Sequence, residues 1–341
     1  MPSGFWQTTA MRAVLDTRDL GKVMHAFRTH PYHGRVITQE TAAGWVGMSQ
    51  SRLSRTSRVG SSTTTPPGSC SGRMYWASHR SYCGSSTYTE AVGQQLLRTT
   101  ARLQKLTGWL AFDAGQQAVA RNCFTDAPAL ARQSGDAETE TFALAQLAFQ
   151  SITLGQPREG LRFAVTAEQA IASLREPSVL PAIPYLRQAR ASALVGDTHA
   201  SDQAITQART VLDRHGDEPT EEWLAFLNHS EIDRTEASCA MDLGRASRAE
   251  ALLEPAVAGL GDRFARNRAA GHVQLARARL DRKEVDGAVE AAHAALDDLA
   301  GDVASWRVTS RLDAVAQSLT TDYPGVTGVD SFLDRHQVLN L

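Results

Sequence analysis

A pattern of glycine and small residues recurs along the C-terminal two thirds of this 341-residue chain, and it constrains the fold more than any other feature. In each copy, small or apolar residues follow a helix-ending residue at offsets of five, nine and twelve positions. The copies begin at Gly115, Gly155, Gly196, Gly244 and Arg282, with spacings of 40, 41, 48 and 38 residues. Glycine can end one helix in a tight turn, and the later positions keep one face of a second helix turned inward. Because one such helix pair cannot bury its apolar face alone, the pattern predicts a stack of paired helices.

The same periodicity places individual helices. Residues 142–153 and 223–234 are apolar at helical spacing, and each is expected to form the first helix of a pair. Pro128 falls within a second helix, which it should kink because proline lacks the backbone amide hydrogen. The segment Val329–Gln337 is expected to form a capping helix. These features predict an all-α repeat domain over residues 91–341.

The offsets resemble those of the tetratricopeptide repeat, which places glycine, alanine, a bulky residue and alanine at these positions. The period here is longer than the ~34 residues of that family, which we interpret as longer helices and loops in the same fold. The resemblance implies a tetratricopeptide-like α-helical solenoid, and therefore a binding and signalling scaffold.

A second motif occupies residues 38–55, which read TQETAAGWVGMSQSRLSR. Thr38 can cap a short helix and Ser49 can cap a second one. Ala43 is small enough for the two helices to cross closely, and Gly47 permits a left-handed turn between them. This is the spacing of a helix-turn-helix, whose second helix reads DNA.

The segment resembles the Cro/C1-repressor type of helix-turn-helix domain, in the order Thr-Gln, Ala, Gly, hydrophobic, Ser and Leu-Ser-Arg. With the helical repeats that follow, the chain is similar to a group of XRE-like bacterial transcriptional regulators that join such a domain to a tetratricopeptide-like tail. The resemblance implies that operator DNA is a partner. Since one head reads only a half-site, a homodimer is also expected.

The resemblance also assigns roles by position. Gln39 would meet the DNA backbone and brace the recognition helix, which Ser49 begins. Side chains in the first turn of that helix would face base edges, where Gln can pair with adenine and Arg with guanine or a phosphate. A phosphate contact is expected from Arg52. The DNA-binding residues implied are Gln39, Ser49, Gln50, Ser51, Arg52 and Arg55. The alternative is an ordinary short helix pair with solvated polar residues.

Residues 56–90 depart from that family. From Arg55 to Tyr88 there is no acidic residue, and Val59 is the only Leu, Ile or Val. Such a Ser/Thr/Gly/Pro-rich stretch buries too little apolar area to offset its ordering entropy, so we predict an irregular or disordered linker. A shifted reading frame over residues 56–88 is the alternative, which the nucleotide sequence of the gene would decide. Either way, the helix-turn-helix domain at residues 1–55 lacks part of its expected core.

Charge and composition narrow the class of protein. Residues 1–90 carry 10 basic and 4 acidic side chains, whereas the whole chain has a net charge of −2. A basic head on an acidic body favours an anionic partner for the head. No apolar run approaches the ~18 residues that span a bilayer, and no secretory signal is visible, so we expect a cytoplasmic protein without membrane contact. The four cysteines are scattered, and we predict neither a metal site nor a cofactor.

Polar residues on the first helices of the repeats could line a groove for a peptide or small-molecule effector. The candidates are Arg187, Asn228 and Glu231, for which a solvated helix face is the alternative. The sequence therefore predicts a DNA-binding transcriptional regulator with a ligand- or partner-sensing repeat domain, and not an enzyme. The competing interpretation is a protein-interaction scaffold with a vestigial DNA-binding head.

Overall fold

The computed structural model describes residues 25, 26, 29, 90–172, 174, 178–216, 222–261, 264–300 and 305–339. Within these ranges every regular element is helical and there is no strand, which confirms the all-α prediction for this part of the chain. The chain divides into two compact units, with a boundary between Leu103 and Gln104. The predicted helix-turn-helix at residues 38–55, with all six DNA-binding residues, lies outside the described residues, and so does the predicted linker up to residue 89.

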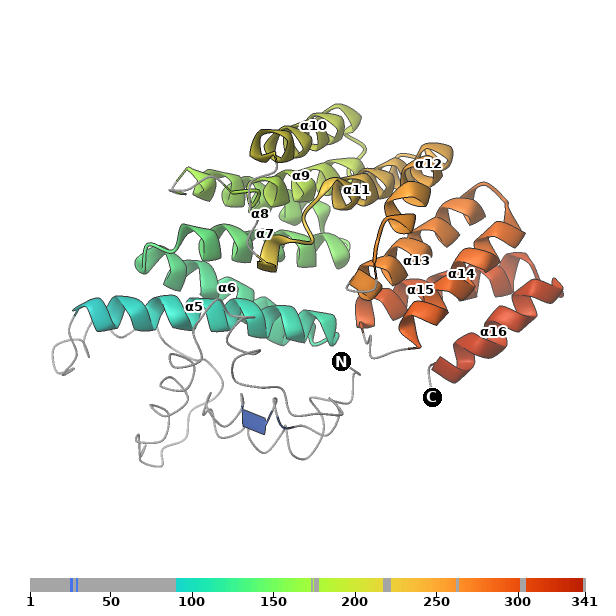
Figure 1. The fold of residues 1–341 in the computed structure, drawn as a ribbon, viewed down its shortest axis with the longest axis horizontal. Coiled ribbons are helices and arrows are strands. Elements are labelled where there is room, and N and C mark those ends of the chain that lie inside the picture. The colour runs from blue at the N-terminus through green and yellow to red at the C-terminus, as the bar shows by residue number, and fades with distance from the viewer. Residues whose placement is uncertain are drawn as a thin grey trace. The chain divides into compact units, whose positions relative to one another are not determined.

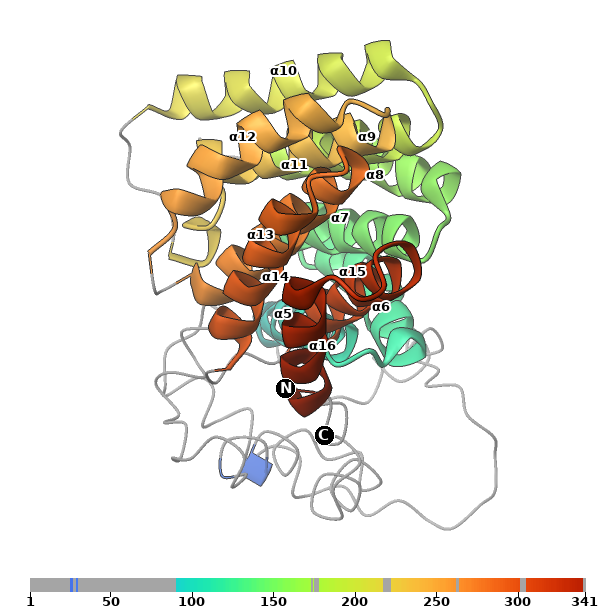
Figure 2. The same cartoon turned by 90° about the vertical axis from the view of Figure 1, so that its right-hand side faces the viewer.

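Twelve α-helices follow one another in the described ranges, joined mostly by short turns. They are α5 (Glu90–Asp113), α6 (Gln117–Gln133), α7 (Ala137–Thr153), α8 (Pro157–Ile171), α9 (Ala182–Leu194), α10 (Thr198–His215), α11 (His229–Asp242), α12 (Ala246–Ala258), α13 (Ala265–Asp281), α14 (Val285–Leu299), α15 (Trp306–Asp322) and α16 (Thr327–Leu339). We call the odd-numbered members the first helices and the even-numbered members the second helices. Figures 1 and 2 both show the helices from α6 to α10 stacked in chain order.

The turns within the pairs repeat one hydrogen-bonding arrangement. At Gly115 the backbone is left-handed, with φ of 77°, and the amide of Gln116 donates to the carbonyl of Ala111 at 2.8 Å. Gly155, Gly196 and Gly244 have the same left-handed backbone, which glycine adopts without a steric penalty. Four of the five predicted copies are therefore confirmed as two helices joined by a tight glycine turn.

The fifth copy is shifted by one residue from its predicted register. The left-handed residue is Lys283, with φ of 65°, and not Arg282. From Lys283, the offsets of five, nine and twelve reach Ala288, Ala292 and Ala295, and all three are fully buried. The prediction failed here because no glycine marks the turn.

One other prediction about a helix is wrong. The segment 223–234 is not one helix: a short 3-10 turn at Glu222–Leu224 precedes α11, which begins only at His229. Pro128 lies inside α6, the second helix of the first pair, as predicted, and α6 continues past it to Gln133. The expected capping helix is present as α16, and it forms a sixth pair with α15 across a left-handed turn at Gly325.

Alanine and leucine dominate the interior of the unit that begins at Gln104. At the second-helix positions of the first copy, Ala120, Phe124 and Ala127 have no exposed surface. Small side chains let helix axes approach, and the larger ones fill the layers between pairs. First helices also contact one another along the stack: α7 contacts α9, α9 contacts α11, and α13 contacts α15. They therefore form a common inner layer. None of the described helices is both long and apolar enough to cross a bilayer.

Candidate functional site

Two of the three residues predicted to contact a ligand lie close together. Arg187 is on α9 and Glu231 is on α11, which pack against each other, and the two side chains interact electrostatically. Asn228 has a different role, because its Oδ1 accepts a hydrogen bond from the amide of Glu231 at 3.1 Å. That contact caps α11 at its first turn. We therefore leave Asn228 out of the site.

Three first helices each carry two charged residues one turn apart. The pairs are Arg187 and Arg190 on α9, Glu231 and Arg234 on α11, and Arg307 and Arg311 on α15. Residues three or four positions apart share a helix face. The charge of Arg311 interacts with those of its neighbours on all three helices. We call the following five residues the arginine cluster: Arg187, Arg190, Arg234, Arg307 and Arg311.

Carboxylates neutralise part of the cluster. Nη1 of Arg234 lies 2.8 Å from Oε2 of Glu231, and Nε of Arg307 lies 3.0 Å from Oδ1 of Asp113. Arg190 forms an ion pair with Asp242 and also donates to the carbonyl of Ser238 at 2.9 Å. Five arginines thus meet three carboxylates. One of the three, Asp113, is shared with a further arginine outside the cluster, so the site carries an excess of at least two positive charges.

Arg187 and Arg311 account for this excess. Neither side chain makes a hydrogen bond or an ion pair with any described residue, and Nε of Arg187 is buried without an acceptor there. Burial, with a smaller contribution from the charge of Arg307, lowers the pKa of Arg187 to about 10 despite the opposing effect of Glu231. A buried donor without a partner is costly, so this arrangement calls for a reason beyond packing.

Arg311 is accessible to solvent and is also surrounded by other arginines. Its side chain is exposed. Yet surrounding protein lowers its pKa to about 10 by desolvation, and the like charges of Arg307, Arg190 and Arg234 contribute to the same lowering. At neutral pH the group remains protonated. Arg311 is therefore a solvent-accessible positive charge that has no ion pair with any described residue and lies near other positive charges.

Aromatic rings hold two of the arginines in place. The guanidinium of Arg187 lies 4.2 Å from the ring centroid of Phe149. That of Arg307 lies 4.8 Å from Trp109 and 5.5 Å from Phe112. The rings of Phe112 and Phe149 are themselves packed edge to face at 5.5 Å. Such cation–π contacts stabilise a guanidinium without neutralising it, so the charge stays available to a ligand.

Asp113 joins the first pair of helices to the last. At the end of α5, its carboxylate accepts from Nη1 of Arg266 at 2.6 Å, from Oγ of Ser305 at 2.8 Å and from Nε of Arg307 at 3.0 Å. Beside it, a Cβ at Gly115 would lie 3.1 Å from the Trp306 ring. We call this set of contacts the closure contact. Because its partners are more than 150 positions away in sequence, the stack of pairs returns on itself at this point.

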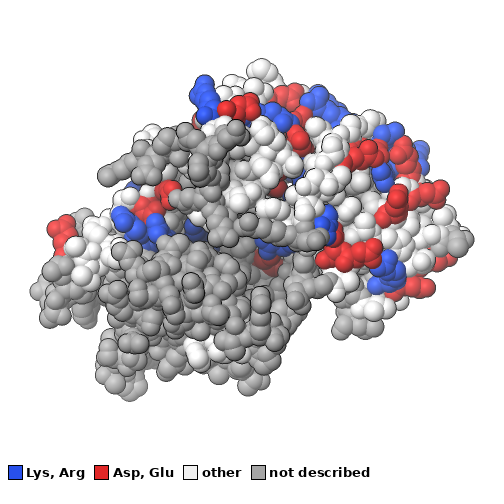
Figure 3. Space-filling view, in the orientation of Figure 1, with Lys and Arg blue, Asp and Glu red and all other residues white. Residues whose placement is uncertain are grey.

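Arginines on the outer surface are paired differently. Arg279 contacts Glu250 at 2.9 Å and Glu254 at 2.7 Å, and Arg282 makes further contacts with Glu250. Arg209 similarly bridges Asp233 and Glu236. Figure 3 shows acidic and basic side chains interspersed on the described helices at the right of the view. The positive excess therefore distinguishes the arginine cluster from these surfaces.

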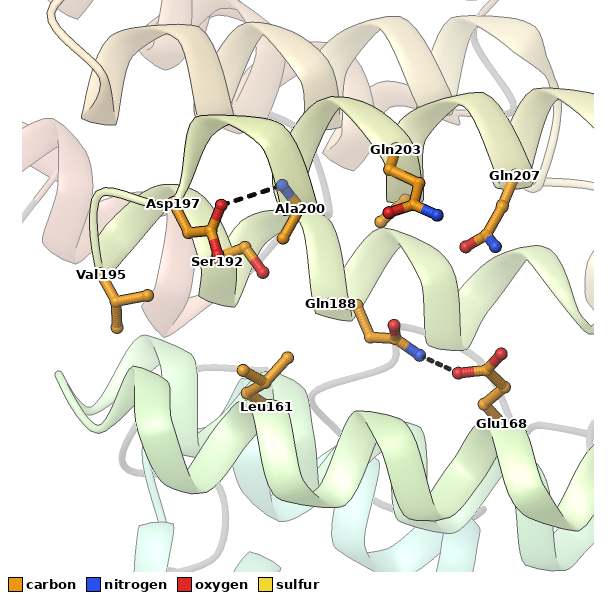
Figure 4. A pocket seen from close by; sticks show the side chains of 10 residues that line it. Leu161, Glu168, Gln188, Ser192, Val195, Asp197, Ala200, Gln203 and Gln207 are labelled. Atoms are coloured by element: carbon orange, nitrogen blue, oxygen red, sulfur yellow. Dashed lines mark hydrogen bonds between the residues drawn. The ribbon is translucent and has the colours of Figure 1, made fainter.

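A shallow groove of about 270 Å³ runs between α8 and α10 over α9. Figure 4 shows Gln188, Gln203 and Gln207 beside it, and a hydrogen bond of 2.6 Å from Gln188 to Glu168. At another part of the groove, Asp197 accepts from the amide of Ala200 and caps α10. Gln188 and Asp197 thus already have partners within the protein, so the groove is a weaker candidate than the arginine cluster.

In comparisons with protein-family models, curated proteins and solved structures, nothing matches this chain. The assignment of a site therefore rests on the geometry of the described residues.

Most of the cluster was not found from the sequence. Of its five members only Arg187 was identified, together with the neighbouring Glu231, as polar residues on first helices. Arg190 follows Arg187 by one turn, and Arg234 follows Glu231 by one turn. This repeated spacing of charged residues could have indicated the cluster. Arg307 and Arg311 lie on α15, beyond the last copy of the glycine pattern, and nothing local marks them as neighbours of α9.

Proposed function

We propose that this chain is a cytoplasmic transcriptional regulator that binds operator DNA and senses an effector through its helical repeats. The helix-turn-helix motif at residues 38–55 supports the first part, with Gln50 and Arg55 as its principal base-reading residues. A tetratricopeptide-like arrangement accounts for the stacked pairs from α5 to α16. The chain acts by binding and not by catalysis, as a homodimer on a two-part operator.

The observation that carries the sensing role is the arginine cluster. Its residues come from three first helices, and Arg187 and Arg311 make no ion pair or hydrogen bond with any described residue. A repeat stack that only held helices together would gain more from apolar side chains at these positions. A ligand that binds across α9, α11 and α15 would instead connect pairs that are distant in sequence.

The DNA-binding role is tested with the full chain and a pool of random duplexes. Selected fragments are measured by gel shift over a salt series, because phosphate contacts alone give binding that is sequence-independent and steeply salt-dependent. Gln50→Ala and Arg55→Ala should each weaken binding to the selected sequence by about tenfold or more, since a bidentate base contact contributes about 1–3 kcal/mol. Gln133→Ala, an exposed glutamine at the end of α6, serves as the matched control.

The second candidate is a protein-interaction scaffold with a vestigial head. It is favoured by residues 56–88, which contain no acidic residue and one Leu, Ile or Val. Circular dichroism of the same preparation separates the two functions. A fully helical protein that selects no duplex sequence supports the scaffold and contradicts the regulator.

A further inference from the structure

We propose that the arginine cluster binds a small oxyanion with at least two negative charges, either a phosphoryl compound or a di- or tricarboxylate. This inference deepens the proposed function, because it names the chemical class of the effector that the repeats would sense. The shared chemistry is a group of closely spaced, negatively charged oxygens. Arg187, Arg311 and the free donors of Arg307 are the residues that would contact it.

The charge of the site sets the valence of the ligand. Five arginines meet three carboxylates, which leaves two or more positive charges without a partner in the described structure. A singly charged ligand would leave repulsion among the remaining guanidinium groups. An anion with two or three charges would balance the excess. Arg311 and the like charges that now repel it would then be attracted to the same ligand.

The donors of the site suit oxygen anions. A guanidinium is planar and offers its N–H groups in a rigid fork that matches carboxylate and phosphate oxygens two at a time. The buried Nε of Arg187 lacks an acceptor, whereas Arg190 and Arg234 already have carboxylate partners. Arg307 uses Nε for Asp113, which leaves its terminal nitrogens for a ligand.

The site is held in position before a ligand arrives. Phe149 supports Arg187, and Trp109 and Phe112 support Arg307, through cation–π contacts between 4.2 and 5.5 Å. Rotamers that are fixed in advance reduce the entropy lost on binding. Arg311 supplies access, because its side chain is exposed while its charge interacts with three other members of the cluster.

Binding is measured by titration calorimetry and thermal shift on the full chain, without DNA. The probes are inorganic phosphate, pyrophosphate and citrate, with acetate as the singly charged comparison and sodium chloride to match the ionic strength. Pyrophosphate or citrate should bind at least tenfold more tightly than singly charged acetate. Pyrophosphate and citrate together distinguish a phosphoryl source from a carboxylate source.

Two variants remove the proposed ligand contacts. Arg311→Gln changes an exposed residue and should fold normally, and Arg187→Met keeps most of the volume of a half-buried one. Each should weaken anion binding about tenfold or more, as expected for one charge-assisted contact. Without ligand, Arg311→Gln should also raise the melting temperature, because it removes a like charge. The control is Arg277→Gln on α13, whose side chain is 54% exposed and pairs with Asp281.

The outcomes are distinct. Tight binding of a multivalent anion that Arg311→Gln weakens and Arg277→Gln leaves unchanged supports the inference. It is overturned if no probe binds better than acetate, or if Arg277→Gln loses as much affinity as Arg311→Gln. A chain that binds the anion but selects no operator contradicts the DNA-binding function alone. A chain that selects an operator but binds no anion contradicts this inference alone.

Discussion

Replacing Asp113 with asparagine should destabilise the helical repeats by about 3 kcal/mol. The side chain of Asp113 is only 9% exposed, and it accepts three hydrogen bonds from partners on the last part of the stack. Removing one member of a buried ion pair costs about 3–5 kcal/mol, because the other charge is left buried. We take the lower end of that range because Arg266 is 40% exposed, so its ion pair with Asp113 contributes only as much as a surface pair.

The effect of pH provides an internal check on this value. Desolvation raises the pKa of Asp113, but the charges of Arg307 and Arg266 and the hydrogen bonds from Ser305 and Arg307 outweigh it and hold the pKa below its ordinary value. A carboxyl whose pKa is lower in the folded state stabilises fully above its unfolded pKa of about 3.9. That contribution disappears as the pH falls through the folded value. The difference in the free energy of unfolding between wild type and Asp113→Asn should therefore be constant from about pH 5 to 7 and shrink below about pH 4.

Urea unfolding followed by circular dichroism measures this difference. The matched control is Asp281→Asn, because Asp281 is also paired with an arginine, Arg277, but at a partly exposed position within one helix. Its pair should contribute about 0.5 kcal/mol or less. If Asp113→Asn costs no more than this control at pH 7, the closure contact does not stabilise the fold. A loss that stays constant down to about pH 3 would equally contradict the assigned electrostatic origin.

Two further substitutions test the turns and the packing of the pairs. Lys283→Gly should stabilise the protein by about 1 kcal/mol, because a left-handed backbone is costly for a residue with a Cβ. Arg282→Gly should destabilise the protein, because φ at Arg282 is −91° and needs no glycine. If Arg282→Gly instead has the higher melting temperature of the two variants, the register predicted from the sequence is the correct one. Gly108→Ala should cost about 1–3 kcal/mol, because its Cβ would lie 2.6 Å from the buried ring of Phe124. The double variant with Phe124→Leu should recover part of that loss in a denaturation cycle, whereas strict additivity would exclude the steric explanation.

The local parts of the fold followed from the sequence. Gly115, Gly155, Gly196 and Gly244 identified turns because a left-handed residue has few chemical substitutes. The small residues after each glycine identified the face that packs inward. The same reasoning misplaced the fifth copy, where Lys283 adopts the left-handed conformation without the residue type that announces it. It also joined residues 223–234 into one helix, because apolar periodicity alone cannot show where Asn228 caps α11.

The arrangement of the site depends on information that no single repeat contains. The rotation between successive pairs accumulates along the stack, so whether α15 reaches the end of α5 is decided by all the intervening contacts together. The candidate ligand residues on α9 and α11 could be named from their helix faces, but the contribution of α15 could not. The head, including Gln39 and Arg55, lies outside the described residues, and its role remains a prediction from the motif.

Arg307 belongs both to the closure contact and to the arginine cluster, and this double membership determines how a ligand would act on the fold. Its Nε is bound to Asp113, while its charge adds to the repulsion that acts on Arg187 and Arg311. An anion held by the remaining donors of Arg307 does not need to displace Asp113, since one guanidinium can serve two carboxylate-like partners. It would remove repulsion among α9, α11 and α15 while leaving the contact with α5 in place. Binding would therefore strengthen the closed stack, and the free energy of ligand binding would add to the stability of the closure contact.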